Sequence, residues 1–285
     1  MPPMIETYPL PIKRPFSWRA LWILVGLQLL GNLLSIPTLK ATGQPIDPLP
    51  VWILWTVISI PIIALSLFLG GRIGLGAPLL EGFLYGQERK EWAQTVIALS
   101  IFVAVAASPL ILLVNRQVDS EDYPAIWKLL LASVDAGVQE EIFNRFFLMT
   151  ILAWLGSLIW REANGRPTNT VLWIAILVAG LFFGWAHVDD KLSIPGVPFI
   201  DYFILMVVGT VYGVVFGWLY WKLGIEGAIL AHFAIDVMAS VIIVPTYLSQ
   251  NAFLQIIALL GIILAGFSAW LVLRKIQAEK SKIAP

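Results

Sequence analysis

Eight stretches of the chain are almost continuously apolar, and each is long enough for a helix that crosses a lipid bilayer. About 20 mainly apolar residues in a helix span a hydrocarbon core ~30 Å thick. The connections between the stretches are too short to hold a soluble domain. The pattern therefore predicts an all-α, polytopic integral membrane protein with about eight transmembrane helices, over residues 18–38, 50–70, 92–114, 125–160, 170–188, 200–221, 225–248 and 252–273.

The fourth stretch is too long for one simple crossing. A helix over residues 125–160 would extend ~54 Å at 1.5 Å per residue, well beyond the thickness of the hydrocarbon core. We expect this helix to tilt, to protrude or to break near Gly137.

Composition agrees with a lipid environment and removes several classes of function. Apolar residues make up 59% of the 285 residues and charged residues 13%. Cysteine is absent, which excludes disulfides, thiolate metal ligands and a thiol nucleophile. The 18 basic and 18 acidic residues balance, so no nucleic-acid partner is expected. Nothing in the first sixteen residues has the pattern of a removable signal peptide.

The distribution of basic residues predicts the orientation of the chain. If both termini are cytoplasmic, most Lys and Arg residues fall in inner segments, and the outer segments carry only Lys40, Arg116, Lys128 and Lys191. Cytoplasmic loops are the ones enriched in Lys and Arg. We therefore expect a multi-pass protein in the lipid bilayer with both termini in the cytoplasm.

Three charged residues lie close together in the middle of the fourth stretch: Glu140, Glu141 and Arg145. A charge at mid-membrane depth costs roughly 2.5–3.5 kcal/mol, so such residues usually face a cavity or a partner and mark function. The i,i+4 spacing lets Arg145 neutralise Glu141, whereas Glu140 points about 100° away around the helix and keeps its carboxylate free. The alternative is a charge cluster that only fixes helix packing.

Both histidines of the chain lie in or at the end of apolar stretches. His187 ends the run Phe182-Phe183-Gly184-Trp185-Ala186-His187, and His232 shares a helix face with Asp236 at i,i+4, where the carboxylate can orient the imidazole or favour its protonated form. A membrane histidine can also serve only as a hydrogen bond between helices.

Depth along the helices gives a partial check on whether these side chains meet. Counting 1.5 Å per residue places Glu140 and His232 both in the cytoplasmic half of the membrane. The same count places His187 farther toward the outer side, unless its helix is displaced toward the cytoplasm. A re-entrant segment over residues 192–199 would explain such a displacement.

Three motifs in this order, Glu-Glu-x-x-x-Arg at 140–145, Phe-x-x-x-His at 183–187 and His-x-x-x-Asp at 232–236, resemble those of the CAAX protease and bacteriocin-processing family, also called the Abi family. The resemblance covers roughly residues 125–236. It implies an intramembrane endopeptidase with a polar cavity among its helices, acting on a membrane-associated peptide or protein, of the type II CAAX prenyl endopeptidase kind. We interpret residues 1–285 as one membrane domain with a catalytic core at about 125–240.

Carried over to this chain, the resemblance implies that Glu140 and His187 activate a water molecule. It further implies that Glu141 and Arg145 support the site and that His232 and Asp236 stabilise the oxyanion. A carboxylate in an apolar cavity suits a general base, and positioned donors near an oxyanion supply electrostatic stabilisation.

The chain departs from the family pattern at two positions, with Asp236 where Asn is common and Phe146 where Gly is common. An ionised Asp236 would repel an oxyanion, so it must be protonated or must hold His232 as a cation. Alternatively, Glu140, His187, His232 and Asp236 bind zinc, whose usual ligands are of these types. We prefer the mechanism without a metal, and no cofactor is firmly predicted.

Two other classes of function stay open. One is a proton-coupled membrane transporter, in which intramembrane Glu, His and Asp residues relay protons. The other is a non-catalytic membrane immunity or scaffold protein. Asp135, in the same stretch as Glu140, either lines the substrate cavity or belongs to a polar helix end near the outer interface.

Overall fold

The structure, a computed structural model, describes residue 10 and residues 13–41, 48–87, 90–114, 123–192 and 198–283. These residues form helices and connections, with one isolated antiparallel bridge between Arg161 and Pro167, so the predicted all-α class is confirmed. In chain order the helices are α1 (Trp18–Ala41), α2 (Pro48–Ile73), α3 (Pro78–Leu84), α4 (Lys90–Val114), α5 (Ile126–Glu141), η1 (Ile142–Met149), α6 (Thr150–Ser157), α7 (Asn169–Leu192), α8 (Phe199–Leu223), α9 (Ile225–Val237), η2 (Met238–Ile243), α10 (Val244–Leu248) and α11 (Ala252–Ile283).

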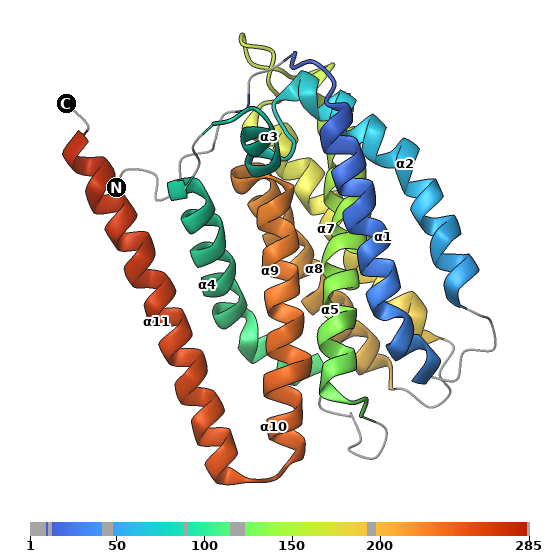
Figure 1. The fold of residues 1–285 in the computed structure, drawn as a ribbon, viewed down its shortest axis with the longest axis vertical. Coiled ribbons are helices and arrows are strands. Elements are labelled where there is room, and N and C mark those ends of the chain that lie inside the picture. Colours follow the sequence, from blue (N-terminus) through green and yellow to red (C-terminus); the bar gives the residue numbers. More distant parts are fainter. Residues whose placement is uncertain are drawn as a thin grey trace.

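Each predicted crossing coincides with a helix or with consecutive helices that follow one another without a connection. Within the described part of the chain, seven helices are long and apolar enough to cross a membrane. The fourth predicted stretch is divided into α5, η1 and α6, each shorter than a crossing. The protein is thus a polytopic membrane protein, and α1 starts at the end of the bundle where α11 finishes (Figure 1).

Of the three alternatives for the fourth stretch, the break near Gly137 is wrong, because α5 continues through this residue. A Cβ atom at Gly137 would lie 3.2 Å from the carbonyl oxygen of Ile229 and 3.2 Å from the amide nitrogen of Phe233. The glycine therefore allows α5 and α9 to approach closely, as small residues do between membrane helices. The irregularity lies just beyond it, in the π-helix η1, and π-helical turns often occur at functional sites.

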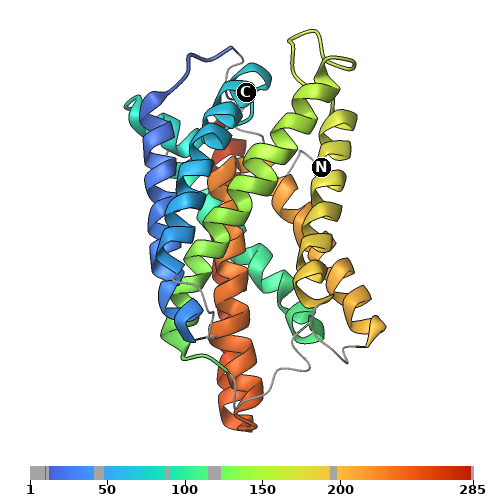
Figure 2. The same cartoon turned by 90° about the vertical axis from the view of Figure 1, so that its right-hand side faces the viewer.

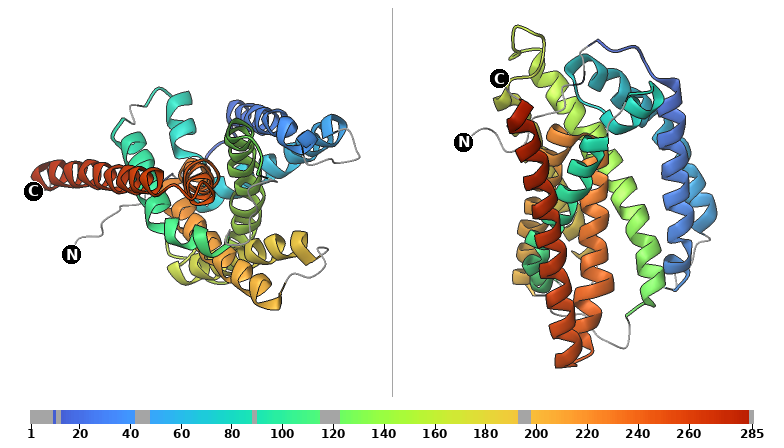
Figure 3. Two further views of the ribbon diagram at one scale, coloured as in Figure 1. Left: turned by 90° about the horizontal axis from the view of Figure 1, so that it is seen from below. Right: turned by 60° about the vertical axis from the view of Figure 1, so that its left-hand side comes forward.

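Helices α5 and α9 run side by side through the middle of the molecule (Figures 1 and 2). Helix α1 packs on α5 and on α2, and α7 and α8 pack on each other. Helix α4 packs on α9, and α11 packs mainly on α4 at the edge of the bundle (Figure 3). This arrangement places the charged segment of the fourth stretch among α7, α8 and α9.

The interior of the bundle contains a buried arginine and several large aromatic side chains. Arg145, Phe146, Phe216 and Tyr220 are among the largest fully buried side chains, and they belong to η1 and α8. The outward faces carry many exposed large apolar side chains, most of all along α11. A surface of this kind is suited to lipid rather than to water.

A tight turn at Gly224 fixes the start of α9. The residue has a φ of 86°, in the left-handed region that favours glycine. The amide of Ile225 donates to the carbonyl of Gly76, and the amide of Leu80 donates to the Glu226 carboxylate at 2.9 Å. These bonds attach the first turn of α9 to the connection that contains α3. They thereby help to fix the position of His232 along the bundle axis.

Candidate functional site

The candidate site gathers residues from three segments that are far apart in the sequence. Glu140 and Glu141 end α5 and Arg145 lies in η1, His187 lies in the last turns of α7, and His232 and Asp236 lie in α9. The structure brings all six together through the ion pairs and short distances described below. The close packing of α5 on α9 at Gly137 and of α7 on α8 makes this convergence possible.

One half of the site, the dry half, is buried and held by an ion-pair network, although Glu141 Oε2 and Arg145 Nε and Nη2 have no hydrogen-bond partner among the described residues. Glu141 Oε1 accepts from Arg145 Nη1 at 3.0 Å and faces His232 Nδ1 at 2.8 Å. The side chains of Glu141 and Arg145 are 0% exposed, and that of His232 is 6% exposed. The predicted i,i+4 pair is therefore confirmed, and it is extended by an imidazole from another helix. Leaving any one of these charges without its partner inside the bundle would be costly.

Two phenylalanines complete the dry half. The ring of Phe216 stacks on the imidazole of His232 with centroids 4.8 Å apart, and the guanidinium carbon of Arg145 lies 4.2 Å from the centroid of Phe183 and 5.2 Å from that of Phe216. Aromatic faces attract cations and exclude water. They thus hold Arg145 and His232 in fixed positions.

The other half of the site is open. The side chains of Glu140, His187 and Asp236 are 35%, 37% and 30% exposed. Glu140 Oε2 lies 3.8 Å from His187 Nε2 and 3.9 Å from His232 Nε2, beyond direct hydrogen-bonding distance. Oε2 accepts no hydrogen bond from any described residue. As expected from its helical position, Glu140 keeps a free carboxylate oxygen.

The orientation of His187 is set by its own helix. Its Nδ1 lies 2.8 Å from the carbonyl oxygen of Phe183, which can only accept, so Nδ1 carries the proton. In the neutral ring Nε2 then presents a lone pair toward Glu140. The two side chains therefore lie side by side, although the depth count placed them at different levels; the displacement of α7 toward the cytoplasm stays a prediction. The suggested re-entry over 192–199 rests mainly on residues 193–197, which lie outside the described residues.

Asp236 lies on the same helix face as His232, as the spacing predicted, but it does not orient the imidazole through a hydrogen bond. Asp236 Oδ2 lies 3.6 Å from His232 Nε2, so the two share a face as predicted, but the distance is longer than a hydrogen bond. The carboxylate that orients the imidazole is that of Glu141, 91 positions away in the sequence. The i,i+4 relation alone could not reveal this competitor.

Three further residues bear on the site in ways that the sequence left open or did not indicate. Asn144 donates from Nδ2 to the carbonyl of Glu140 at 2.9 Å, and Phe216 stacks on His232; both were missed because neither stands out in its apolar stretch. Asp135 is buried against α1, where a Cβ atom at Gly31 would lie 3.3 Å from Asp135 Oδ1. It therefore lies between α1 and α5, and not at an exposed helix end.

The zinc alternative requires several ligand atoms around one point, each about 2.0–2.2 Å from the ion. Among the described residues, no group of three or more His, Asp or Glu side chains is arranged so that it could hold a metal ion. Glu140, His187, His232 and Asp236 come close to one another, but they do not fit this requirement. We derive no step through a metal.

These features define a class of protein: a polytopic helical membrane protein in which carboxylates, imidazoles and one guanidinium meet inside the bundle. A family model described as type II CAAX prenyl endopeptidase Rce1-like matches residues 122–238. This range contains all three motifs, so the match confirms the resemblance to the CAAX protease family. It supports an intramembrane protease in general, and the roles of single side chains stay predictions. Comparison with curated proteins and with solved structures gives no match.

Proposed function

We propose that this protein is an intramembrane endopeptidase in which Glu140 and His187 activate a water molecule that attacks a peptide bond. The observation that carries the proposal is the position of Glu140 Oε2, a free acceptor 3.8 Å from His187 Nε2. A water molecule with hydrogen bonds of about 2.8 Å can bridge two acceptors at this separation. Its two protons would point to Glu140 and His187, which leaves a lone pair directed away from them.

In the proposed reaction, the water oxygen attacks the carbonyl carbon of the scissile bond while Glu140 takes one of its protons. The carbonyl electron pair moves onto oxygen and forms an oxyanion. When this pair returns, the bond between carbon and nitrogen breaks, and Glu140 gives its proton to the leaving amine. The products are a new carboxyl terminus and a new amino terminus, and Glu140 returns to its starting state. A positioned general base of this kind contributes typically about 10²–10⁴-fold.

His232 is the proposed oxyanion donor. Its Nδ1 faces the Glu141 carboxylate at 2.8 Å, and its Nε2 faces Asp236 at 3.6 Å and Glu140 at 3.9 Å. Three carboxylates around one ring favour the protonated imidazole, which donates from both nitrogens. In this arrangement Asp236 is a positioning residue that keeps the imidazole protonated. At the oxyanion, the positive charge of His232 outweighs the negative charge of Asp236.

The proposed substrate is a peptide or protein held at the membrane. The open half of the site is formed by Glu140, His187 and Asp236, so the scissile bond must reach it from within the bilayer region. The matching family is described as prenyl endopeptidases, which favours a substrate whose cleavage site is carried to the membrane by a lipid group. The distribution of basic residues favours a cytoplasmic position for both termini.

Cleavage by purified protein tests the proposal. The protein is incubated in detergent or nanodiscs with farnesylated peptides that end in a CAAX sequence and with the same peptides without the lipid, and products are identified by mass spectrometry in water enriched in ¹⁸O. We expect one ¹⁸O atom in the new carboxyl group, and loss of cleavage in Glu140→Gln. Glu91→Gln, an exposed glutamate at the start of α4, is the matched control and should cleave normally.

Cleavage that persists in Glu140→Gln would overturn the assignment of the general base. Proton flux into liposomes that depends on Glu140, with no peptide product from either peptide set, would favour a transporter. Loss of activity on dialysis against a chelator, restored by zinc, would contradict the mechanism without a metal.

A further inference from the structure

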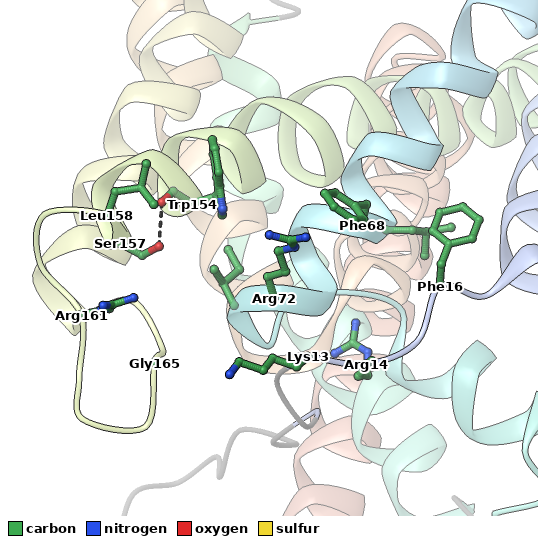
Figure 4. A pocket seen from close by; sticks show the side chains of 12 residues that line it. Lys13, Arg14, Phe16, Phe68, Arg72, Trp154, Ser157, Leu158, Arg161 and Gly165 are labelled. Atoms are coloured by element: carbon green, nitrogen blue, oxygen red, sulfur yellow. Dashed lines mark hydrogen bonds between the residues drawn. The ribbon is translucent and has the colours of Figure 1, made fainter.

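A cavity of about 610 Å³ lies at the end of the bundle where α1 starts, and no candidate site residue lines it. Its walls come from the segment before α1, the end of α2, the end of α6 and the hairpin that follows α6 (Figure 4). Four basic residues line it, Lys13, Arg14, Arg72 and Arg161, and no acidic residue does. A cavity with this lining is suited to an anion.

Among the described residues, three of the four cations have no protein counter-charge. The side chains of Lys13, Arg72 and Arg161 form no hydrogen bond or ion pair with another residue in the part of the chain that the structure describes. Arg14 differs, because its Nε lies 2.9 Å from Glu81 Oε2 and its guanidinium also donates to the carbonyl of Leu75. Three positive charges around one space, with no counter-charge from the described residues, repel one another, and a bound anion would relieve this repulsion.

The backbone around the cavity holds these cations in place. Lys13 has a φ of 59°, which a non-glycine residue rarely adopts, and the next amide, that of Arg14, donates to the carbonyl of Gly71 at 3.2 Å. Arg161 pairs with Pro167 in the isolated bridge, and the amide of Glu162 donates to the carbonyl of Arg166 at 2.8 Å. In Figure 4 the side chains of Lys13 and Arg161 extend toward the same space.

Apolar side chains continue the cavity toward the lipid-facing surface. The guanidinium carbon of Arg72 lies 4.2 Å from the ring centroid of Phe68, and Trp154 faces Arg72 across the cavity (Figure 4). Phe68 and Leu158 are 46% and 60% exposed, so they extend the lining outward as an apolar surface. Charge at one side and apolar surface at the other match an amphiphilic anion.

We propose that this cavity binds the phosphate group of an anionic amphiphile, with the phosphate among Lys13, Arg72 and Arg161 and the apolar tail along Phe68 and Leu158. Arginine side chains bind phosphate oxygens through charge-assisted, often paired hydrogen bonds. Basic pockets between transmembrane helices are known sites for lipid phosphates. Two sources share this chemistry, a phospholipid headgroup and a soluble phosphorylated compound. The proposal does not depend on peptidase activity.

Binding measurements on the full chain test the proposal. The wild-type protein and the triple variant Lys13→Gln, Arg72→Gln, Arg161→Gln are reconstituted in phosphatidylcholine nanodiscs with or without phosphatidylglycerol, and retained lipid is counted by native mass spectrometry after release into neutral detergent. A second arm titrates inorganic phosphate and glycerol phosphate into the detergent-solubilised protein and follows the shift in thermal unfolding. The matched control is Arg19→Gln, Lys90→Gln, Arg274→Gln, which removes three exposed basic residues at the same end of the bundle.

We expect the wild type and the control to retain phosphatidylglycerol, and the triple variant to bind it at least tenfold more weakly, since each basic residue near an anionic headgroup changes binding by about fivefold. Saturable binding of the soluble phosphates that is lost only in the triple variant would support the same cavity with a soluble ligand. Equal binding by all three proteins, or equal loss in the triple variant and the control, would overturn the proposal. If the triple variant does not fold, Arg161→Gln alone, in the exposed hairpin, is measured in the same way.

Discussion

Glu140 and Glu141 are consecutive residues of one helix, yet they lie in opposite environments. The side chain of Glu141 is 0% exposed and its Oε1 binds both Arg145 and His232, whereas that of Glu140 is 35% exposed and its Oε2 lies 3.8 Å from His187 Nε2, with no hydrogen bond from any described residue. The 100° turn between neighbouring helical positions is enough to separate them. The comparison teaches that the dry half of the site can hold the helices together while the open half stays available for chemistry.

The largest expected effect is a loss of stability when the ion pairs of the dry half are broken. Arg145→Met leaves the Glu141 carboxylate with His232 as its only described partner inside the bundle, and breaking a buried pair in this way costs about 3–5 kcal/mol. Unfolding in detergent, followed by circular dichroism, measures the change in the free energy of unfolding. The exposed Arg274→Met is the control and should change it little. A loss below about 1 kcal/mol in Arg145→Met would mean that the pair does not hold the helices together.

The next effect separates the two nitrogens of His232. In His232→Asn the amide nitrogen can replace Nδ1 and keep the bond to Glu141, but nothing replaces Nε2. We expect the free energy of unfolding to stay near that of the wild type, while the cleavage rate falls about 10²–10³-fold, as on removal of an oxyanion donor.

His232→Gln is the complementary variant, because its longer amide can reach the position of Nε2 instead. We expect it to retain more activity than His232→Asn and to be the less stable of the two. If His232→Gln were the less active or the more stable of the two variants, His232 would have a structural role alone.

The smallest effect comes from the spacing of the helices that carry the open half. A Cβ atom at Gly184 would overlap the carbonyl oxygen of Met206, so Gly184→Ala must push α7 away from α8 and move His187 relative to Glu140. Overpacking of this kind costs about 1–3 kcal/mol. In the matched control Gly26→Ala, the added Cβ meets no atom within 4 Å, and the helix gains up to about 1 kcal/mol. Equal stability and activity in the two variants would show that this helix contact does not position His187.

The sequence predicted the helices and the residues of the candidate site well. It predicted less well which of these side chains contact one another. Apolar length alone placed the crossings, because lipid requires continuous helices. The pair of Glu141 and Arg145 was predictable since it depends only on helical spacing. The bond from His232 to Glu141 and the stacking of Phe216 depend on how α5, α8 and α9 pack, which no local pattern encodes. The length of the fourth stretch left a break near Gly137 as one of three alternatives, whereas this glycine serves the close approach of α5 to α9.

The most direct test of this account compares Glu140→Gln with Glu141→Gln, two neighbouring substitutions of the same chemistry. For Glu140→Gln we predict a cleavage rate lower by about 10²–10⁴-fold with an unchanged unfolding midpoint. For Glu141→Gln we predict a clearly lower unfolding midpoint, because a neutral amide leaves the buried guanidinium of Arg145 without its counter-charge. A Glu140→Gln protein that cleaves at the wild-type rate, or one destabilised as strongly as Glu141→Gln, would contradict the division of the site into a structural half and a reactive half.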